Sequence, residues 1–237
     1  NQPVPIEVIP CCADTQLFDP TQVSSVLRDR YIKQLKLTEN YFILTYLGSV
    51  GTWYMLPEML DFFKKLLITQ PNAIFLFITA ELPQSIIDTA QEKGVSIDSL
   101  RIIAAAREEV PTLLSLTNVG IFFIKPVFSK KASSPTKQGE MMSMGIPVIC
   151  NSGVGDTDFV IENYKAGILV EAFNDTVYQE VIDKLTVKPW ADPKTIRKHA
   201  EAFYSLEKGA ETYASIYDHL IGLPKKTIPQ IYKSPVY

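Results

Sequence analysis

Short apolar segments alternate with segments of helical periodicity through most of the chain. Apolar, β-branched and aromatic residues dominate seven segments that we expect to form strands, at residues 6–9, 41–47, 73–79, 100–104, 119–124, 147–150 and 167–170. Several, such as the run from Ile74 to Ile78, have no polar position on either side of the strand. Strands of this kind are typical of a parallel sheet, because helices cover both of its faces.

The segments between these strands carry apolar residues three or four positions apart, as amphipathic helices do. The predicted helices cover residues 56–67, 83–93, 109–116, 135–144, 156–162 and 174–185. The repeated strand–helix order predicts an α/β fold with a Rossmann-like, doubly wound parallel sheet and right-handed crossovers.

The pattern changes after Pro189, where two consecutive helices are predicted at residues 194–203 and 206–221. The second helix has an apolar face made by Leu206, Ala210, Tyr213, Tyr217 and Leu220. Prolines at 224, 229 and 235 then predict an extended tail. We therefore divide the chain into a leading segment (1–20), a Rossmann-like domain (21–188), C-terminal helices of the same domain (189–222) and a tail (223–237).

Composition and charge exclude several classes of protein. The 237 residues include 26 acidic and 23 basic side chains, and a net charge of −3 argues against a surface for nucleic acid. Three cysteines are too few for a disulfide framework, and two distant histidines argue against a histidine-based metal site or triad. No apolar run reaches the ~18 residues of a membrane span, and we expect no signal peptide.

From these features we expect a cytoplasmic protein without a bound metal or cofactor, with peripheral contact at the inner face of the membrane left open. The chain begins with Asn1 rather than Met, so we expect it to be a piece of a longer protein.

Ligands of doubly wound sheets bind beyond the carboxyl ends of the strands. After the strand at 41–47, Gly48, Ser49, Gly51 and Thr52 form a glycine-containing turn that would let the backbone approach a ligand closely. The alternative is a tight strand-to-helix turn without a ligand, since the glycines match neither a complete dinucleotide fingerprint nor a Walker loop.

Residues 133–140 form the second candidate site. Ser134 is a favourable N-cap and Pro135 a favourable first helical residue. The N–H groups of Thr136 and Lys137 would lie at the positive end of the helix, which stabilises an anion by roughly 0.3–1 kcal/mol. Glu140 follows one turn later and could accept hydrogen bonds from sugar hydroxyls. The alternative is an ordinary helix start with an exposed Lys137–Glu140 pair.

Other polar residues lie near the same edge of the predicted sheet. Arg107 would meet a nucleobase or phosphate, or belong to a helix cap with Glu108 and Glu109. Lys130 and Lys131 precede Ser133 and would be either solvated or beside the anion site.

Two further features have a structural and a functional interpretation. Trp53 and Tyr54 would stack on a nucleobase or cover the first helix of the sheet. We expect Asp156 to cap the helix at 156–162, where its charge would repel a phosphate.

Three stretches resemble the C-terminal, nucleotide-sugar-binding domain of a GT-B glycosyltransferase of the retaining group 1 (family 4) kind. Residues 8–18 resemble the crossing from the first domain to the second, and residues 42–51 resemble the strand with the glycine turn. Residues 134–149, which include Glu140 and the run Gly145-Ile146-Pro147, resemble the donor-site helix and the next strand. Together the three stretches span most of residues 6–185.

This resemblance implies two facing Rossmann-like domains, of which the second holds the donor and the first holds the acceptor. It places the ribose at Glu140, the diphosphate at residues 133–137 and the glycine turn, and the base near Arg107 and Val110. The predicted nucleotide-sugar-binding residues are Gly48, Ser49, Gly51, Thr52, Arg107, Val110, Ser133, Ser134, Pro135, Thr136, Lys137 and Glu140. No catalytic residue is assigned.

The sequence departs from the family pattern at three positions. Ser49 and Tyr54 stand where the family has basic residues, and Ala132 stands where it has the first glutamate of a pair. Neutralisation of the diphosphate would then fall to Lys130, Lys131 or Lys137.

We therefore expect the donor-binding half of a glycosyltransferase of glycan or polysaccharide assembly, inactive alone because its N-terminal acceptor domain is missing. The alternatives are a noncatalytic interaction module with a degenerate site and a nucleotide-sugar epimerase. A dinucleotide oxidoreductase fits less well, because the glycine fingerprint is incomplete.

Overall fold

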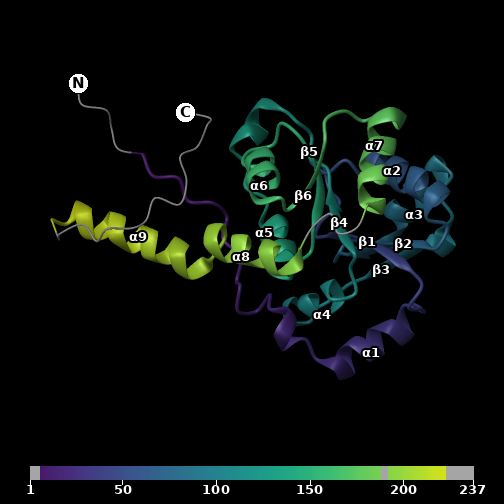
Figure 1. Cartoon of the computed structure of the whole chain (residues 1–237), viewed down its shortest axis with the longest axis horizontal. Coiled ribbons are helices and arrows are strands. Elements are labelled where there is room, and N and C mark those ends of the chain that lie inside the picture. Colours follow the sequence, from purple (N-terminus) through teal and green to yellow (C-terminus); the bar gives the residue numbers. More distant parts are fainter. Residues whose placement is uncertain (1–5, 188–191, 223–237) are drawn as a thin grey trace.

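A six-stranded parallel sheet forms the centre of the computed structural model, which describes residues 6–187 and 192–222 (Figure 1). The strands are β1 (Phe42–Leu47), β2 (Ala73–Ile78), β3 (Leu100–Ile103), β4 (Val119–Phe122), β5 (Val148–Asn151) and β6 (Gly167–Val170). Their order is β3-β2-β1-β4-β5-β6, and all neighbours are parallel. The predicted Rossmann-like, doubly wound sheet is confirmed.

Helices cover both faces of the sheet (Figure 1). They are α1 (Ser25–Gln34), α2 (Leu56–Thr69), α3 (Pro83–Lys93), α4 (Val110–Leu114), α5 (Thr136–Ser143), α6 (Thr157–Tyr164), α7 (Asp175–Thr186), α8 (Pro193–Phe203) and α9 (Leu206–Leu220). Helix α2 packs against α3 and α7, whereas α5 packs against α8. The strand order reverses between β1 and β4, so right-handed crossovers place the helices of one half of the sheet on one face and those of the other half on the opposite face. That reversal leaves room for a ligand at the carboxyl ends of these two strands.

The leading segment differs from the sequence prediction. Residues 6–9 are not a strand, because they reach no edge of the sheet and run beside α9. Ala13 instead forms an isolated parallel bridge with Ser205, at the junction of α8 and α9. Helix α1 was not predicted, because Tyr31 is its only buried residue and its sequence lacks an apolar stripe.

Helix α9 extends away from the sheet (Figure 1). Its buried positions are the small residues Gly209, Thr212 and Ser215. A Cβ atom at Gly209 would lie 2.3 Å from the Cys12 sulfur, so this face of α9 packs on the leading segment. The apolar face predicted for this helix is therefore largely open, and Tyr213 and Tyr217 are exposed.

Arg197 on α8 joins three separate parts of the chain. Its Nη1 atom donates hydrogen bonds to the carbonyl oxygens of Phe18 (2.7 Å) and Ser143 (2.6 Å), and Nη2 donates to that of Thr15 (3.2 Å). The guanidinium also pairs with Asp19 and Glu201. The leading segment, the end of α5 and α8 are thereby held together. The predicted tail at 223–237 lies outside the described residues.

Candidate functional site

The chain turns sharply after β1, and hydrogen bonds fix this turn. Gly48 has a φ of +102°, a conformation that side-chain-bearing residues rarely adopt. Ser49 Oγ donates to Glu81 Oε1 (2.5 Å) and accepts from the N–H of Gly51 (3.2 Å). The Tyr46 hydroxyl donates to the carbonyl oxygen of Ser49. The predicted glycine turn is therefore held in one conformation by hydrogen bonds at the carboxyl edge of the sheet.

The start of α5 differs in detail from the prediction. Pro135 occupies the N-cap position, and no side chain caps the helix. Ser134 is not the cap: its Oγ donates to Asp156 Oδ2 (2.9 Å) and accepts from the N–H of Cys11 (3.1 Å). The first N–H groups of a helix have no acceptor within it. The N-terminus of α5, which no side chain caps, is therefore able to bind an anion.

Lys137 is buried and points at the glycine turn. Its Nζ atom donates a hydrogen bond to the Tyr46 hydroxyl (2.9 Å) and lies 3.7 Å from the ring centroid of Tyr54. A Cβ atom built on Gly48 would lie 3.4 Å from the same Nζ. Burial lowers the pKa of Lys137 to about 7, and the charge of Glu140 opposes that shift.

Glu140 takes its partner from another element. Arg107 Nη1 donates to Glu140 Oε1 at 3.0 Å, and the two side chains are 55% and 10% exposed. The ring of Phe18 supports the guanidinium from 5.4 Å. Burial raises the pKa of Glu140, and Arg107 partly opposes the rise. The alternative of an exposed Lys137–Glu140 pair is wrong, because both residues are buried.

A pocket of about 440 Å³ lies beside the glycine turn, at the ends of β1, β2 and β3. Leu47, Ile78, Ala105 and Val110 give it apolar walls, and Glu81 lies on its polar side. A flat aromatic ring with a few polar groups would suit such a surface.

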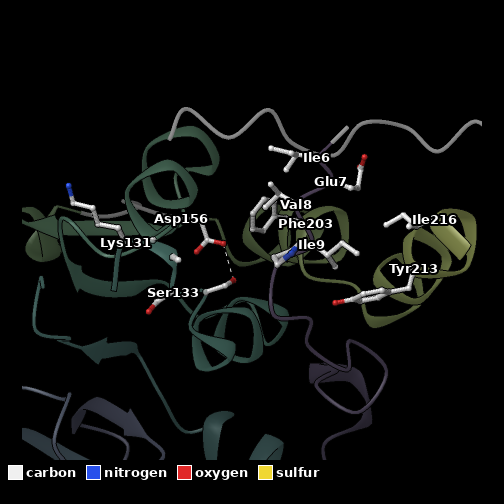
Figure 2. A pocket seen from close by; sticks show the side chains of 14 residues that line it. Ile6, Glu7, Val8, Ile9, Lys131, Ser133, Asp156, Phe203, Tyr213 and Ile216 are labelled. Carbon is white, nitrogen blue, oxygen red and sulfur yellow. Dashed lines mark hydrogen bonds between the residues drawn. The ribbon is translucent and has the colours of Figure 1, made fainter. Parts of the chain in front are cut away.

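A second pocket, of about 600 Å³, lies between the leading segment, α9 and the loop before α5 (Figure 2). Ser133, Ser134 and Lys131 line this pocket rather than the first. Asp156 faces it in Figure 2, and burial raises the pKa of this carboxyl to about 6. Asp156 stands at the N-cap position of α6 as predicted, but its side chain does not cap that helix.

The structure separates the predicted site residues into two groups. Gly48, Ser49, Lys137 and Val110 surround the turn and its pocket, and Arg107 meets Glu140 nearby. Thr52 and Thr136 are exposed. Among the remaining lysines, Lys130 lies 4.4 Å from the centroid of the Trp53 ring. Trp53 and Tyr54 thus each contact a lysine, and Tyr54 also packs against the core.

Three residues of the site were not found in the sequence. Tyr46 lies inside a strand and carries no local signal, and Phe18 and Glu81 are distant in sequence from the groups that they contact. Tyr54 was considered as a residue that stacks on a base or covers a helix and as a departure from the family pattern, but its contact with Lys137 was not predicted.

A metal site and a membrane-spanning helix each place requirements on the residues that the structure describes. Within 6–187 and 192–222, no three His, Cys, Asp or Glu side chains are arranged to hold a metal ion. No helix in this part of the chain is both long and apolar enough to span a membrane.

Solved structures with the same fold include several glycosyltransferases. Sucrose-phosphate synthase from Thermosynechococcus elongatus is 21% identical, with a TM-score of 0.67 over 90% of this chain and 52% of that chain. WaaG, a glycosyltransferase involved in lipopolysaccharide biosynthesis, is 18% identical, with a TM-score of 0.70 over 89% and 55%. HepE from Anabaena, in complex with UDP and glucose, is 14% identical, with a TM-score of 0.66 over 90% and 55%.

This chain spans about half the length of each of these structures. No curated protein sequence matches it. The family model for glycosyl transferases group 1 matches residues 28–203, which is more than half of the 237 residues. The chain therefore belongs to the group 1 glycosyl transferases.

Proposed function

We propose that this chain binds the donor of a glycosyltransferase, a nucleoside diphosphate sugar whose sugar is transferred to a hydroxyl acceptor. One observation carries the proposal: the glycine turn lies against Lys137 in the first turn of α5, one turn before Glu140, and an apolar pocket lies beside the same turn. Ligands of open α/β sheets bind at this edge, where the strand order reverses. UDP bound to HepE, which has the same fold, is consistent with such a donor.

The diphosphate would lie between the glycine turn and the start of α5. Negative charge grows on this leaving group as the bond to the sugar breaks. The helix N-terminus and a nearby lysine stabilise such charge without reorganising, because they are already in place. The lysine candidates from the sequence are Lys130, Lys131 and Lys137.

The nucleoside would occupy the pocket at the ends of β1, β2 and β3. Its base would contact Val110 and the other apolar walls, and its ribose hydroxyls would donate hydrogen bonds to Glu140. Arg107 already holds one oxygen of that carboxylate, so it orients Glu140 toward the ribose.

The acceptor would be bound by a second domain, because this chain spans about half of the similar structures. Retention of anomeric configuration and a place in polysaccharide assembly are part of the same proposal. We expect the chain alone to bind a donor but not to turn it over, since both substrates must be held together for reaction.

Calorimetric titration with UDP, GDP and ADP tests the proposal. We expect one of the three nucleotides to bind to a folded sample. The absence of binding by all three would contradict it.

The Glu140→Ala variant tests the ribose assignment. Loss of a hydrogen bond to a charged group costs about 1.5–3 kcal/mol, so affinity for the bound nucleotide should fall about 10- to 100-fold. Glu162→Ala removes an exposed carboxylate on α6 and serves as the control. Equal affinity of the Glu140→Ala variant and the unmodified chain would remove the assignment.

A noncatalytic interaction module is the second candidate. Two observations favour it: Ala132 offers no carboxylate to a transferred sugar, and Arg107 already occupies the Glu140 carboxylate. The titration separates the two candidates, because a degenerate site would leave the chain indifferent to all three nucleotides.

A further inference from the structure

A buried ammonium group lies at the glycine turn without a carboxylate in contact. Lys137 is only 8% exposed, and none of the ion pairs between described residues includes it. Burying an unpaired charge is costly, and proteins normally supply a counter-charge. A buried lysine without a carboxylate partner is suited to bind an anionic ligand.

Two tyrosines hold the ammonium in place. Nζ lies 4.1 Å from the centroid of the Tyr46 ring and 3.7 Å from that of the Tyr54 ring. The rings meet edge to face, with centroids 5.8 Å apart and planes at 76°. Cation–π attraction to both rings and the hydrogen bond to the Tyr46 hydroxyl fix the position of the Lys137 ammonium group. These groups form the tyrosine cage, which we define as Tyr46 and Tyr54.

The tyrosine cage positions the Lys137 Nζ atom next to Gly48. The absence of a side chain on Gly48 keeps the space next to Nζ open on the side of the turn. Lys130 instead lies against Trp53, and exposed Lys131 lines the other pocket. Lys137 is therefore the lysine that the structure places between the turn and the start of α5.

We propose that Lys137, positioned by Tyr46 and Tyr54, is the cation that pairs with the donor diphosphate, and that binding is coupled to uptake of a proton by its Nζ atom. This inference rests on the proposed donor-binding function and names the residue that neutralises the diphosphate. The proton comes from solvent, and no covalent bond to the donor changes.

The surrounding titratable groups support this coupling. Tyr46 faces Nζ from β1 and Tyr54 from the turn before α2, and burial raises the pKa of both phenols, so they stay neutral. Glu140, one turn along α5, pairs with Arg107, and Glu81 lies beyond Ser49. Because the pKa of Lys137 is about 7, most of these side chains are neutral at pH 8.5 until an anion stabilises the charged form.

The test is calorimetric titration of the whole chain with UDP-glucose, GDP-mannose and ADP-glucose. Their diphosphates do not titrate near neutral pH, so proton uptake reports on the protein. Measurements in buffers of different ionisation enthalpy should show uptake of about one proton at pH 8.5, and affinity should be about 20-fold weaker at pH 8.5 than at pH 6.5.

Substitutions assign the effect to Lys137. Lys137→Met should weaken binding at pH 6.5 about 10- to 100-fold and abolish proton uptake. Lys33→Met, at an exposed position of α1, is the matched control and should change neither. Adding Tyr54→Lys to Lys137→Met returns an ammonium to the same space and should restore part of the affinity.

Tyr46→Phe tests the role of the cage. It retains the ring but removes the acceptor for Nζ, so the pH at which affinity falls should move lower. A merely structural tyrosine would change stability but not this pH profile.

Three outcomes would overturn the inference. If a nucleotide sugar binds equally to the Lys137→Met variant and to the unmodified chain, Lys137 is not the cation, while the donor-binding function stands. If Lys130→Met abolishes binding and Lys137→Met does not, the diphosphate is neutralised by Lys130. If no nucleotide sugar binds to folded protein, the proposed function fails as well.

Discussion

Lys137 and Glu140 lie one turn apart on α5, yet each finds its partner on another element. Nζ reaches Tyr46 on β1, and the carboxylate reaches Arg107, in the short 3₁₀ turn (Arg107–Glu109) before α4. On an exposed helix the two charges would face each other across one turn. Here the two buried side chains contact different elements, so the ionisation of each depends on residues far away in the sequence as well as on the charge of the other.

Lys137 should make stability depend on pH. Its pKa is about 7 in the folded chain and near 10.5 in the unfolded chain, so the unfolded state binds more protons between these values. The free energy of unfolding, relative to a Lys137→Met variant, should therefore rise as pH increases from 7 to 9, by up to about 1.4 kcal/mol per pH unit. Urea unfolding of both proteins across this range measures the difference. A flat difference would show that Lys137 is not desolvated.

Among the elements, helix α5 is buried along almost its whole length. A Cβ atom at Gly139 would lie 2.9 Å from the Tyr204 ring and 3.2 Å from the Ala13 side chain. Both neighbours are fully buried. Because Gly139 has no side chain, Tyr204 at the junction of α8 and α9 packs directly against α5. This packing helps to fix the orientation of α5.

Gly139→Ala should destabilise the fold, because the added methyl group has no space and the neighbours are rigid. Overpacking of this kind costs typically about 1–3 kcal/mol. The midpoint of urea unfolding should fall accordingly. Gly51→Ala is the comparison, because the nearest neighbour of the added methyl group is the exposed Ser49 hydroxyl at 3.3 Å, and little loss is expected. Equal stability of the two variants would contradict the close packing.

The sheet was predictable from the sequence, and part of the site was not. The strand at Ala73–Ile78 is apolar on both faces, which only a covered parallel strand requires. Residues 6–9 show the same local pattern but pack on α9, since local composition does not specify the partner. Gly48 and Glu140 were found through their chemistry, but the tyrosine cage depends on contacts between positions up to 91 residues apart.

On the scale of the whole molecule, the leading segment and the C-terminal helices form one unit. Ala13 donates its N–H to the Tyr204 carbonyl oxygen at 2.7 Å, and Arg197 binds the backbone of Thr15 and Phe18. Phe18 in turn supports Arg107, which holds Glu140. The junction at Arg197 is thus connected to the candidate ribose site through side chains in contact.

Arg197→Ala should weaken this unit. The variant loses several hydrogen bonds from a charged group that is 20% exposed, each worth about 1.5–3 kcal/mol when it is well formed. We expect a loss of at least about 1.5 kcal/mol in the free energy of unfolding by urea. Lys198→Ala, at an exposed position of the same helix, should have little effect. Equal stability of these two variants would show that the junction is not structural.

The contacts of Arg197 limit how far the protein can be shortened at either end. A version trimmed at its front to begin with α1 would lose the backbone oxygens that Arg197 binds and the phenyl ring beneath Arg107. Trimming the back before α8 would remove Arg197 itself and bare the side of α5 that carries Gly139. A shortened version of the sheet domain must therefore keep both flanks, although neither flank contributes a strand to the sheet.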